Sequence, residues 1–188
     1  MPCASRGACA IGLLVACAWA GAAEIGAASP DLCTPPQRVM FHCAVGAKAV
    51  SLCADVEGGR IAALTYRYGT PARVELAHTI RSAAGLAAAV TPVAPRASVR
   101  QLSFARGDVT YILSQCVGSA CAQSARLAAL RGDRIVFNRP CRRTADDRAW
   151  FAPELARFGN DAASSEALTE LIRFDDVDHD IERLYLPR

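Results

Sequence analysis

The fold is decided by Cys33–Ala54, which reads C-T-P-P-Q-R-V-M-F-H-C-A-V-G-A-K-A-V-S-L-C-A. Three cysteines stand in it at even spacing, in the pattern C-x9-C-x9-C. Arg38–Val45 and Ala49–Ala54 have the character of strands, and Gly46–Lys48 joins them. The stretch therefore predicts a β-hairpin that disulfides tie into the rest of a domain.

The beginning of the chain has the pattern of a secretory signal peptide, which we place at residues 1–23. Arg6 supplies the positive charge, and Ala8–Trp19 is apolar but too short to cross a membrane. Ala20–Ala22 offers the small-x-small site that signal peptidase cleaves. Because 52% of the 188 residues are hydrophobic, the remainder suits one domain with a sizeable core. We expect an exported protein, periplasmic or secreted.

A second interpretation of this segment makes the protein a lipoprotein. Leu14–Cys17 resembles the bacterial lipobox, in which the cysteine becomes the lipidated first residue. Lipid on Cys17 would hold a soluble domain at a membrane surface. Trp19 and the good cleavage site at Ala22 favour plain secretion, so a membrane is expected as a partner only if Cys17 is lipidated.

Six cysteines follow the leader, and an even number in an exported chain indicates disulfides. They are Cys33, Cys43, Cys53, Cys116, Cys121 and Cys141. Cys116 and Cys121 form the easiest local pair, because the turn between them contains a glycine; the hairpin cysteines would then share Cys141. The connectivity itself cannot be deduced from the sequence. With no C-x-x-C and with His42 isolated, neither a metal site nor a cofactor is predicted.

Further strands follow the hairpin, separated by turn residues. They are expected at Ile61–Tyr68, Arg73–His78, Val99–Ala105, Val109–Gln115, Gln123–Leu130 and Arg134–Cys141. Arg81–Ala97, rich in Ala, Pro and Gly, is expected to be a long surface loop. Arg-Gly-Asp occurs at two predicted hairpin turns, 106–108 and 131–133, where Gly-Asp supplies the positive φ that a short hairpin needs. This turn chemistry explains the tripeptide better than cell adhesion does.

These patterns predict a mainly β fold, an antiparallel meander of seven or eight strands that closes as a barrel or sandwich. After Cys141 the pattern changes to one of short C-terminal helices: Ala149–Phe158 suggests a helical turn, and Ser164–Glu166 a capped helix start. The apolar stripe of that last helix would be Leu168, Leu171 and Ile172. The mature chain is thus divided into a disulfide-tied β domain at 24–143 and an acidic helical segment at 144–188.

Charge divides along the same boundary. Residues 24–143 carry 15 basic against 7 acidic side chains, and residues 144–188 carry 5 against 11. An acidic tail lying over a basic β face accounts for this within the molecule, although exposed pairs add little stability. The alternative is that the basic face meets an anionic partner such as a cell-wall polymer, lipopolysaccharide or an acidic protein. We prefer the internal account, because the opposing charge is already in the chain.

Candidate catalytic groups are few. The histidines are His42, His78 and His179, and no G-x-S-x-G motif is present. Acid pairs for glycoside hydrolysis would be Asp55 with Glu57 or Glu75 with Asp108, which nothing distinguishes from surface acids. No catalytic residue is therefore predicted.

Two other polar groups suggest binding. Alternate carboxylates in Asp175–Glu182 resemble a calcium loop, but Ile181 and Pro187 stand where the EF-hand needs Gly and Glu. Tyr66–Tyr68 could stack on a sugar or a nucleic acid, yet alternate aromatics on a strand are more often core residues. No nucleic-acid partner is predicted.

The cysteine spacing, together with V-x-F-x-C, V-S-x-C-A and Y-R-x-G, resembles a family of small exported bacterial proteins of uncharacterised function. The matching residues are Val39, Phe41, Cys43, Lys48, Val50, Ser51, Cys53, Ala54, Tyr66, Arg67 and Gly69. Cys141 corresponds to a later cysteine of the pattern, whereas Cys116 and Cys121 have no counterpart. The resemblance implies an exported β domain and no known activity.

The expected function is that of a non-enzymatic envelope or periplasmic binding domain whose ligand is an unknown envelope or extracellular protein or polymer. Partner contacts are expected on Arg81–Ala97 and Cys116–Cys121, since binding concentrates on loops held by a rigid sheet. The alternatives are a periplasmic inhibitor or a cell-envelope hydrolase. Bacterial inhibitors of c-type lysozyme are similar small disulfide-tied barrels, but the S-G-x-x-Y loop that they insert is missing here.

Overall fold

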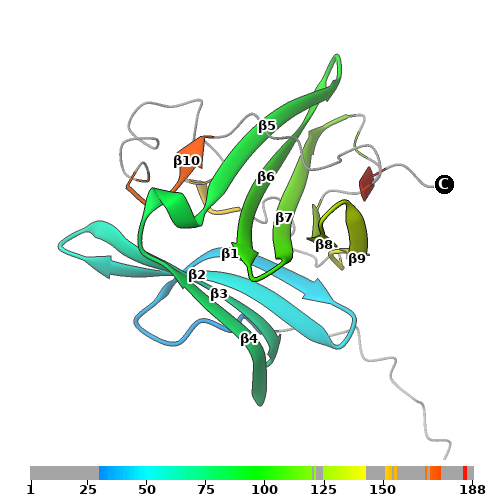
Figure 1. Cartoon of the computed structure of the whole chain (residues 1–188). Helices are drawn as coiled ribbons and strands as arrows, with labels where there is room; N and C mark the ends of the chain where they lie inside the picture. Colours follow the sequence, from blue (N-terminus) through cyan, green and yellow to red (C-terminus); the bar gives the residue numbers. More distant parts are fainter. Residues whose placement is uncertain are drawn as a thin grey trace, which may run out of the picture.

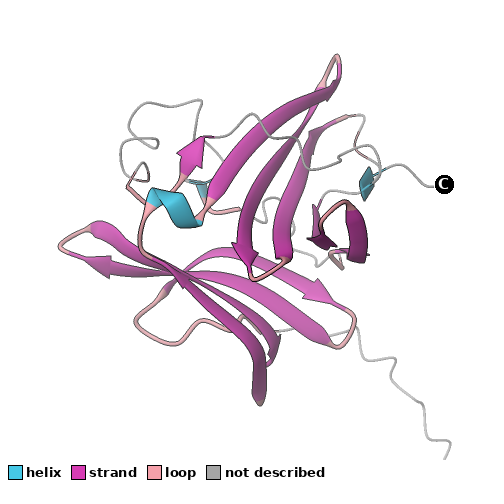
Figure 2. Cartoon of the chain, in the orientation of Figure 1, coloured by secondary structure: helices cyan, strands magenta, loops and turns pink. Residues whose placement is uncertain are grey.

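The structure is a computed structural model that describes residues 30–119, 121, 125–142, 151–153, 155, 168, 170–174 and 184–185. The predicted leader with Cys17, and the acidic run at 175–182, lie outside the described residues. The chain is mainly β, in two sheets that Figure 2 shows as separate layers of strands.

The first sheet, sheet A, is an antiparallel meander in the order β1-β2-β3-β4. Its strands are β1 Arg38–Val45, β2 Lys48–Glu57, β3 Arg60–Thr70 and β4 Arg73–Ile80. The predicted hairpin is confirmed, with Val45 paired to Lys48 across the turn. A register shift between Val39 and Phe41 breaks the expected alternation, so Met40 and Phe41 are both fully buried.

The second sheet, sheet B, has the order β10-β5-β6-β7-β8-β9. Its strands are β5 Ala87–Ala94, β6 Ala97–Arg106, β7 Val109–Gly118, β8 Ala125–Arg131, β9 Arg134–Pro140 and β10 Arg173–Phe174. All neighbours are antiparallel except β10, which pairs parallel to β5. The two Arg-Gly-Asp turns join β6 to β7 and β8 to β9, and Gly107 and Gly132 adopt φ of +63° and +55° there, as the turn chemistry predicts.

The prediction of a long surface loop at Arg81–Ala97 is wrong, because most of this segment is a strand. A short 3-10 turn, η1 Ala83–Gly85, leads directly into β5, whose first alanines are nearly buried against the rest of the molecule. Alanine has low strand propensity and gives no alternation, so pairing with β6 rather than local preference makes this strand.

The two sheets share one hydrophobic core, but they do not close into a barrel, which corrects that alternative. They approach at one corner, where Arg142 N donates to Ala44 O at 2.8 Å. At the opposite side β4 and β5 are separated by η1 and never pair, because the chain leaves one layer for the other there (Figure 1).

The predicted C-terminal helices are not formed as elements in the described part of that segment, where Pro153, Leu155 and Leu184–Tyr185 are the helical residues. Leu168, Leu171 and Ile172 form a single turn in which both later N–H groups donate to Leu168 O. The chain then joins sheet B as β10. One turn suffices to bury all three side chains, and the free edge of β5 outweighs local helix preference. Within the described residues, no helix is long and apolar enough to cross a membrane.

The same segment also completes sheet A. Phe151 forms a β-bridge with Phe41, their rings lie 4.8 Å apart, and Ala152 N donates to Met40 O at 2.7 Å. Leu155 is buried in the same core. The described residues after Cys141 are therefore integral to the β core rather than a separate helical unit.

Three disulfides join the six cysteines, in agreement with the predicted framework. The bonds are Cys33–Cys53, Cys43–Cys141 and Cys116–Cys121. Cys43–Cys141 holds β1 to the chain after β9, at the corner where the sheets meet. Disulfides of this kind fit an oxidising compartment.

The end of the chain docks on the face of sheet B that is turned away from sheet A. Leu184 is buried against Ile112, Ala128 and Leu130. The Tyr185 hydroxyl contacts Ser114 Oγ at 2.8 Å, and its ring lies 5.5 Å from the Arg126 guanidinium. The described contacts of this tail are thus apolar, aromatic and hydrogen-bonded.

Tyr185 should make the stability of the fold sensitive to alkaline pH. Burial raises the pKa of Tyr185 to about 12, against about 10 in an unfolded chain. The unfolded state loses the proton first, so stabilisation is full below pH 10 and falls as pH rises to about 12. Tyr185→Phe removes the titrating hydroxyl. Between pH 10 and 12 the free energy of unfolding of this variant should therefore decrease by up to roughly 2–3 kcal/mol less than that of the wild-type protein, as measured by denaturant unfolding. Equal pH dependence in both proteins would contradict the assignment.

Candidate functional site

A cleft of about 440 Å³ opens between the two sheets where several hairpin turns converge. Strands β3 and β4 form one wall, and strands β7, β8 and β9 form the other. The lining residues are Tyr66, Tyr68, Glu75, Leu76, Val109, Tyr111, Leu127, Ala128, Ala129, Arg131, Val136 and Phe137. This size lies within the range of small-ligand sites.

Aromatic rings form the deep part of the cleft. Tyr66 is fully buried and its ring packs 4.9 Å from Phe104, which stacks on Tyr111 at 5.1 Å. Nearer the opening, Tyr68 meets Phe137 edge-on at 6.3 Å across the two sheets. The alternation of a strand puts Tyr66 and Tyr68 on one face of β3, and pairing of the sheets brings the other rings opposite them.

Ion pairs stand at the mouth of the cleft. On sheet A, Lys48 Nζ lies 2.7 Å from Glu75 Oε2 and 5.2 Å from the centre of the Tyr68 ring. The hydrogen bond that Lys48 donates to Glu75 raises the pKa of Lys48. On sheet B, Arg131 Nε lies 2.9 Å from Asp108 Oδ2, which links the two Arg-Gly-Asp turns. The cleft therefore has an apolar, aromatic interior and a charged opening.

The acid pairs considered for hydrolysis are placed differently by the structure. Asp55 accepts a hydrogen bond from Gln37 Nε2 at 2.8 Å and does not line the cleft. Glu75 lines the cleft, and Asp108 reaches it through Arg131. Each of these two carboxylates is paired with a cation, so donating a proton would require breaking an ion pair first.

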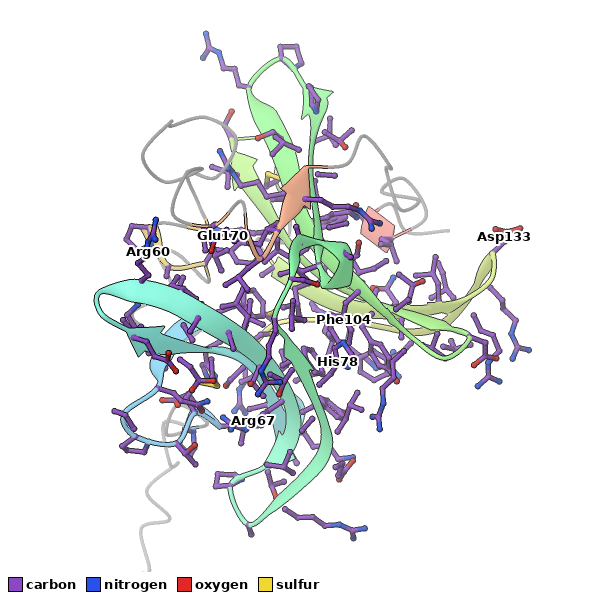
Figure 3. The ribbon with its side chains drawn as sticks, turned by 60° about the vertical axis from the view of Figure 1, so that its left-hand side comes forward. Arg60, Arg67, His78, Phe104, Asp133 and Glu170 are labelled. Atoms are coloured by element: carbon purple, nitrogen blue, oxygen red, sulfur yellow. A yellow bond between two sulfur atoms is a disulfide. The ribbon has the colours of Figure 1, made fainter. Side chains whose placement is uncertain are left out.

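The Tyr66–Tyr68 stacking platform is not formed, because Arg67 points to the other face of sheet A. There Arg67 Nη1 donates to Leu32 O at 3.2 Å and also contacts the Gln37 side chain. Figure 3 shows Arg67 apart from His78 and Phe104. Ser51, on the strand beside it, accepts a hydrogen bond from Leu32 N at 2.9 Å. Arg67 thus fixes the segment before β1.

The two described histidines lie in different places. His42 Nδ1 is 3.3 Å from Ser51 Oγ, while its buried Nε2 has no partner among the described residues. His78 stacks on Phe104 at 4.8 Å between the sheets, and burial together with Arg106 lowers its pKa. No pocket therefore gathers the two histidines with acids, and no group of three metal-binding side chains occurs in the described part of the chain.

No family model matches the chain, and no curated protein or solved structure is detectably similar to it. The cleft therefore has to be interpreted from its own chemistry. Sequence reasoning identified Tyr66 and Tyr68 as a same-face pair but missed Tyr111 and Phe137 as their opposite wall. Each stands alone on its strand, so only the pairing of the sheets brings them into the site.

Proposed function

We propose that this protein is an exported, disulfide-tied binding domain, and that the cleft between its sheets receives the ligand. The observation that carries the proposal is the combination of aromatic walls and a charged opening in one concavity. Ligand sites are typically concave and mainly apolar, with a few polar groups that fix orientation. Export is supported by the signal-like leader and by the three disulfides, and it accords with the resemblance to an exported family.

Binding accounts for the cleft better than hydrolysis does. A hydrolytic site needs a nucleophile or an acid and base that face the substrate. In the described part of the cleft, Glu75 is engaged by Lys48, and Asp108 by Arg131. Tyr68 and Tyr111, which are half-buried, instead offer flat apolar surfaces with hydroxyl groups, which suit recognition.

Filling the cleft should abolish ligand retention without unfolding the protein. Val109 lines the cleft, so Val109→Trp would place an indole in it. Val117 lies on the same strand, is 47% exposed and does not line the cleft, so Val117→Trp is the matched control. Immobilised wild-type protein and Val117→Trp should retain a component of an envelope extract that Val109→Trp loses. Circular dichroism and thiol titration check the fold of each protein.

Two results would overturn the proposal. Equal retention by both tryptophan variants would exclude the cleft as the binding site. Turnover of an envelope polymer by the wild-type protein, lost in Glu75→Gln or Asp108→Asn, would establish the hydrolase alternative instead.

A further inference from the structure

The edges of the two sheets are protected unequally. Edge strands expose unpaired backbone groups, and proteins normally cover them or interrupt them with charge or proline. The edge of β1 is covered by Arg142 and Ala152, which donate to Ala44 O and Met40 O. The edge of β5 is paired with β10.

The edge of β9 is protected by its own charged residues and proline rather than by a neighbouring strand. It carries Arg134 and Arg139 and ends in Pro140. Asn138 of the same strand also donates to Leu184 O at 3.1 Å. Three of the four sheet edges thus have a recognisable device against strand addition.

The remaining edge, that of β4, has neither a covering neighbour nor a proline among the described residues. Its protective features, the charges of Arg73 and Glu75 and a bulge at Glu75, are confined to its first three residues. Leu76–Ile80 contains no proline and no acid, lysine or arginine, and β4 is the last strand of sheet A with no neighbour beyond it in the described chain. Figure 1 shows β4 at the outer side of its sheet. Glu75 and Leu76 of the same strand line the cleft, so the open edge and the cleft are continuous.

We propose that β4 accepts an extended acidic segment of a partner protein as an additional strand, with an apolar side chain of that segment placed at the cleft. This inference rests on the proposed binding function and specifies its ligand class. In strand addition, backbone hydrogen bonds supply affinity and a side-chain pocket supplies specificity. A side chain opposite Leu76 would lie on the cleft side of sheet A, because Leu76 faces that way.

The positive charge at both ends of β4 favours an acidic partner segment. Arg73 begins β4 and Arg81 follows it directly, and both are exposed. Neither forms an ion pair with any residue that the structure describes. The one acid of the strand, Glu75, is already bound to Lys48. An added strand with acids near both ends would therefore meet a cation at each end.

A second copy of this chain fits the edge less well. Pairing two copies antiparallel about Ala77 would place Arg73 of one copy opposite Arg81 of the other, twice. Like charges facing each other across a strand pair are destabilising. The same arginines that attract an acidic partner thus oppose self-pairing.

The test uses a labelled synthetic peptide, Glu-Glu-Val-Thr-Phe-Thr-Val-Glu-Glu, which reads the same in both directions and so presents the same side chains in either orientation. Fluorescence anisotropy should show saturable binding to the folded full-length protein. Arg73→Glu with Arg81→Glu should weaken binding by about tenfold or more. Arg60→Glu, an exposed charge reversal at the start of β3, is the matched control and should leave it unchanged.

A readout of strand addition complements the affinities. The peptide should slow hydrogen exchange at backbone amides of β4, and the same peptide with proline in place of phenylalanine should not. Absence of saturable binding, equal weakening by Arg60→Glu, or protection outside β4 would overturn the inference. Protection of β4 that rises with protein concentration alone would also overturn it, in favour of a second copy. If Val109→Trp loses envelope retention while the peptide fails to bind, the cleft proposal stands and the strand proposal falls.

Discussion

A chain that ends at Arg142 is expected not to reach the native fold. The residues removed include six buried side chains, namely Phe151, Leu155, Leu168, Leu171, Ile172 and Leu184. Burying a side chain of this size contributes about 1.5–3 kcal/mol, so the set contributes roughly 9–18 kcal/mol as an upper estimate. A whole domain is stable by only about 5–15 kcal/mol. The loss is therefore comparable with the entire stability of the protein.

Circular dichroism, denaturant unfolding and thiol titration of the truncated protein measure this effect. Phe151→Ala in the full chain is a smaller change of the same kind. It should lower the free energy of unfolding by about 3–5 kcal/mol, because it removes the ring that packs on Phe41. Glu170→Ala, at an exposed position, should change stability by less than about 0.5 kcal/mol. A truncated protein that unfolds cooperatively with its Cys33–Cys53 bond intact would restore the division into a self-sufficient β domain and a separate tail.

Replacing Cys43 and Cys141 by alanine should produce the next largest loss. This disulfide closes a loop of 98 residues, and the chain-entropy relation assigns about 4.7 kcal/mol to a loop of that order. Both cysteines are buried, at the corner where the two sheets meet. Urea unfolding under non-reducing conditions should show a markedly lower midpoint with an unchanged fold.

The Cys116–Cys121 bond is the internal control for this prediction. It spans only 5 residues, for which the same relation gives about 2 kcal/mol. Replacing that pair should therefore cost less than half as much. Similar losses for both double variants would show that loop length does not govern the contribution of these bonds.

The hairpin and its turns could be predicted because each depends on neighbours in the sequence. Arg38–Val45 is a mainly apolar run that ends at the Gly46 turn, and Gly107 and Gly132 stand where a short turn needs positive φ. β5 could not be predicted in the same way, because its alanines and Pro92 carry no strand pattern. Its conformation comes from β6 and β10 on either side. The register shift between Val39 and Phe41 likewise buries Met40, and strand alternation in the sequence does not predict such a shift.

The cleft was partly predictable for a related reason. Tyr66 and Tyr68 share a face on any strand, which the spacing alone indicates. Tyr111 and Phe137 become their neighbours only when the second sheet packs on the first. The open edge of β4 is not a property of β4 itself, since it follows from how residues far along the chain cover the other edges.

The contact between β1 and the residues after β9 has a consequence for how the protein is made. During synthesis the β1–β2 hairpin emerges early, yet Arg142 and Phe151, which complete its edge, emerge about a hundred residues later. Pairings between such distant parts of a chain form slowly. Until they form, the hairpin presents an uncovered strand, so the newly made chain passes through an interval in which the β1 edge is open to pairing with other chains.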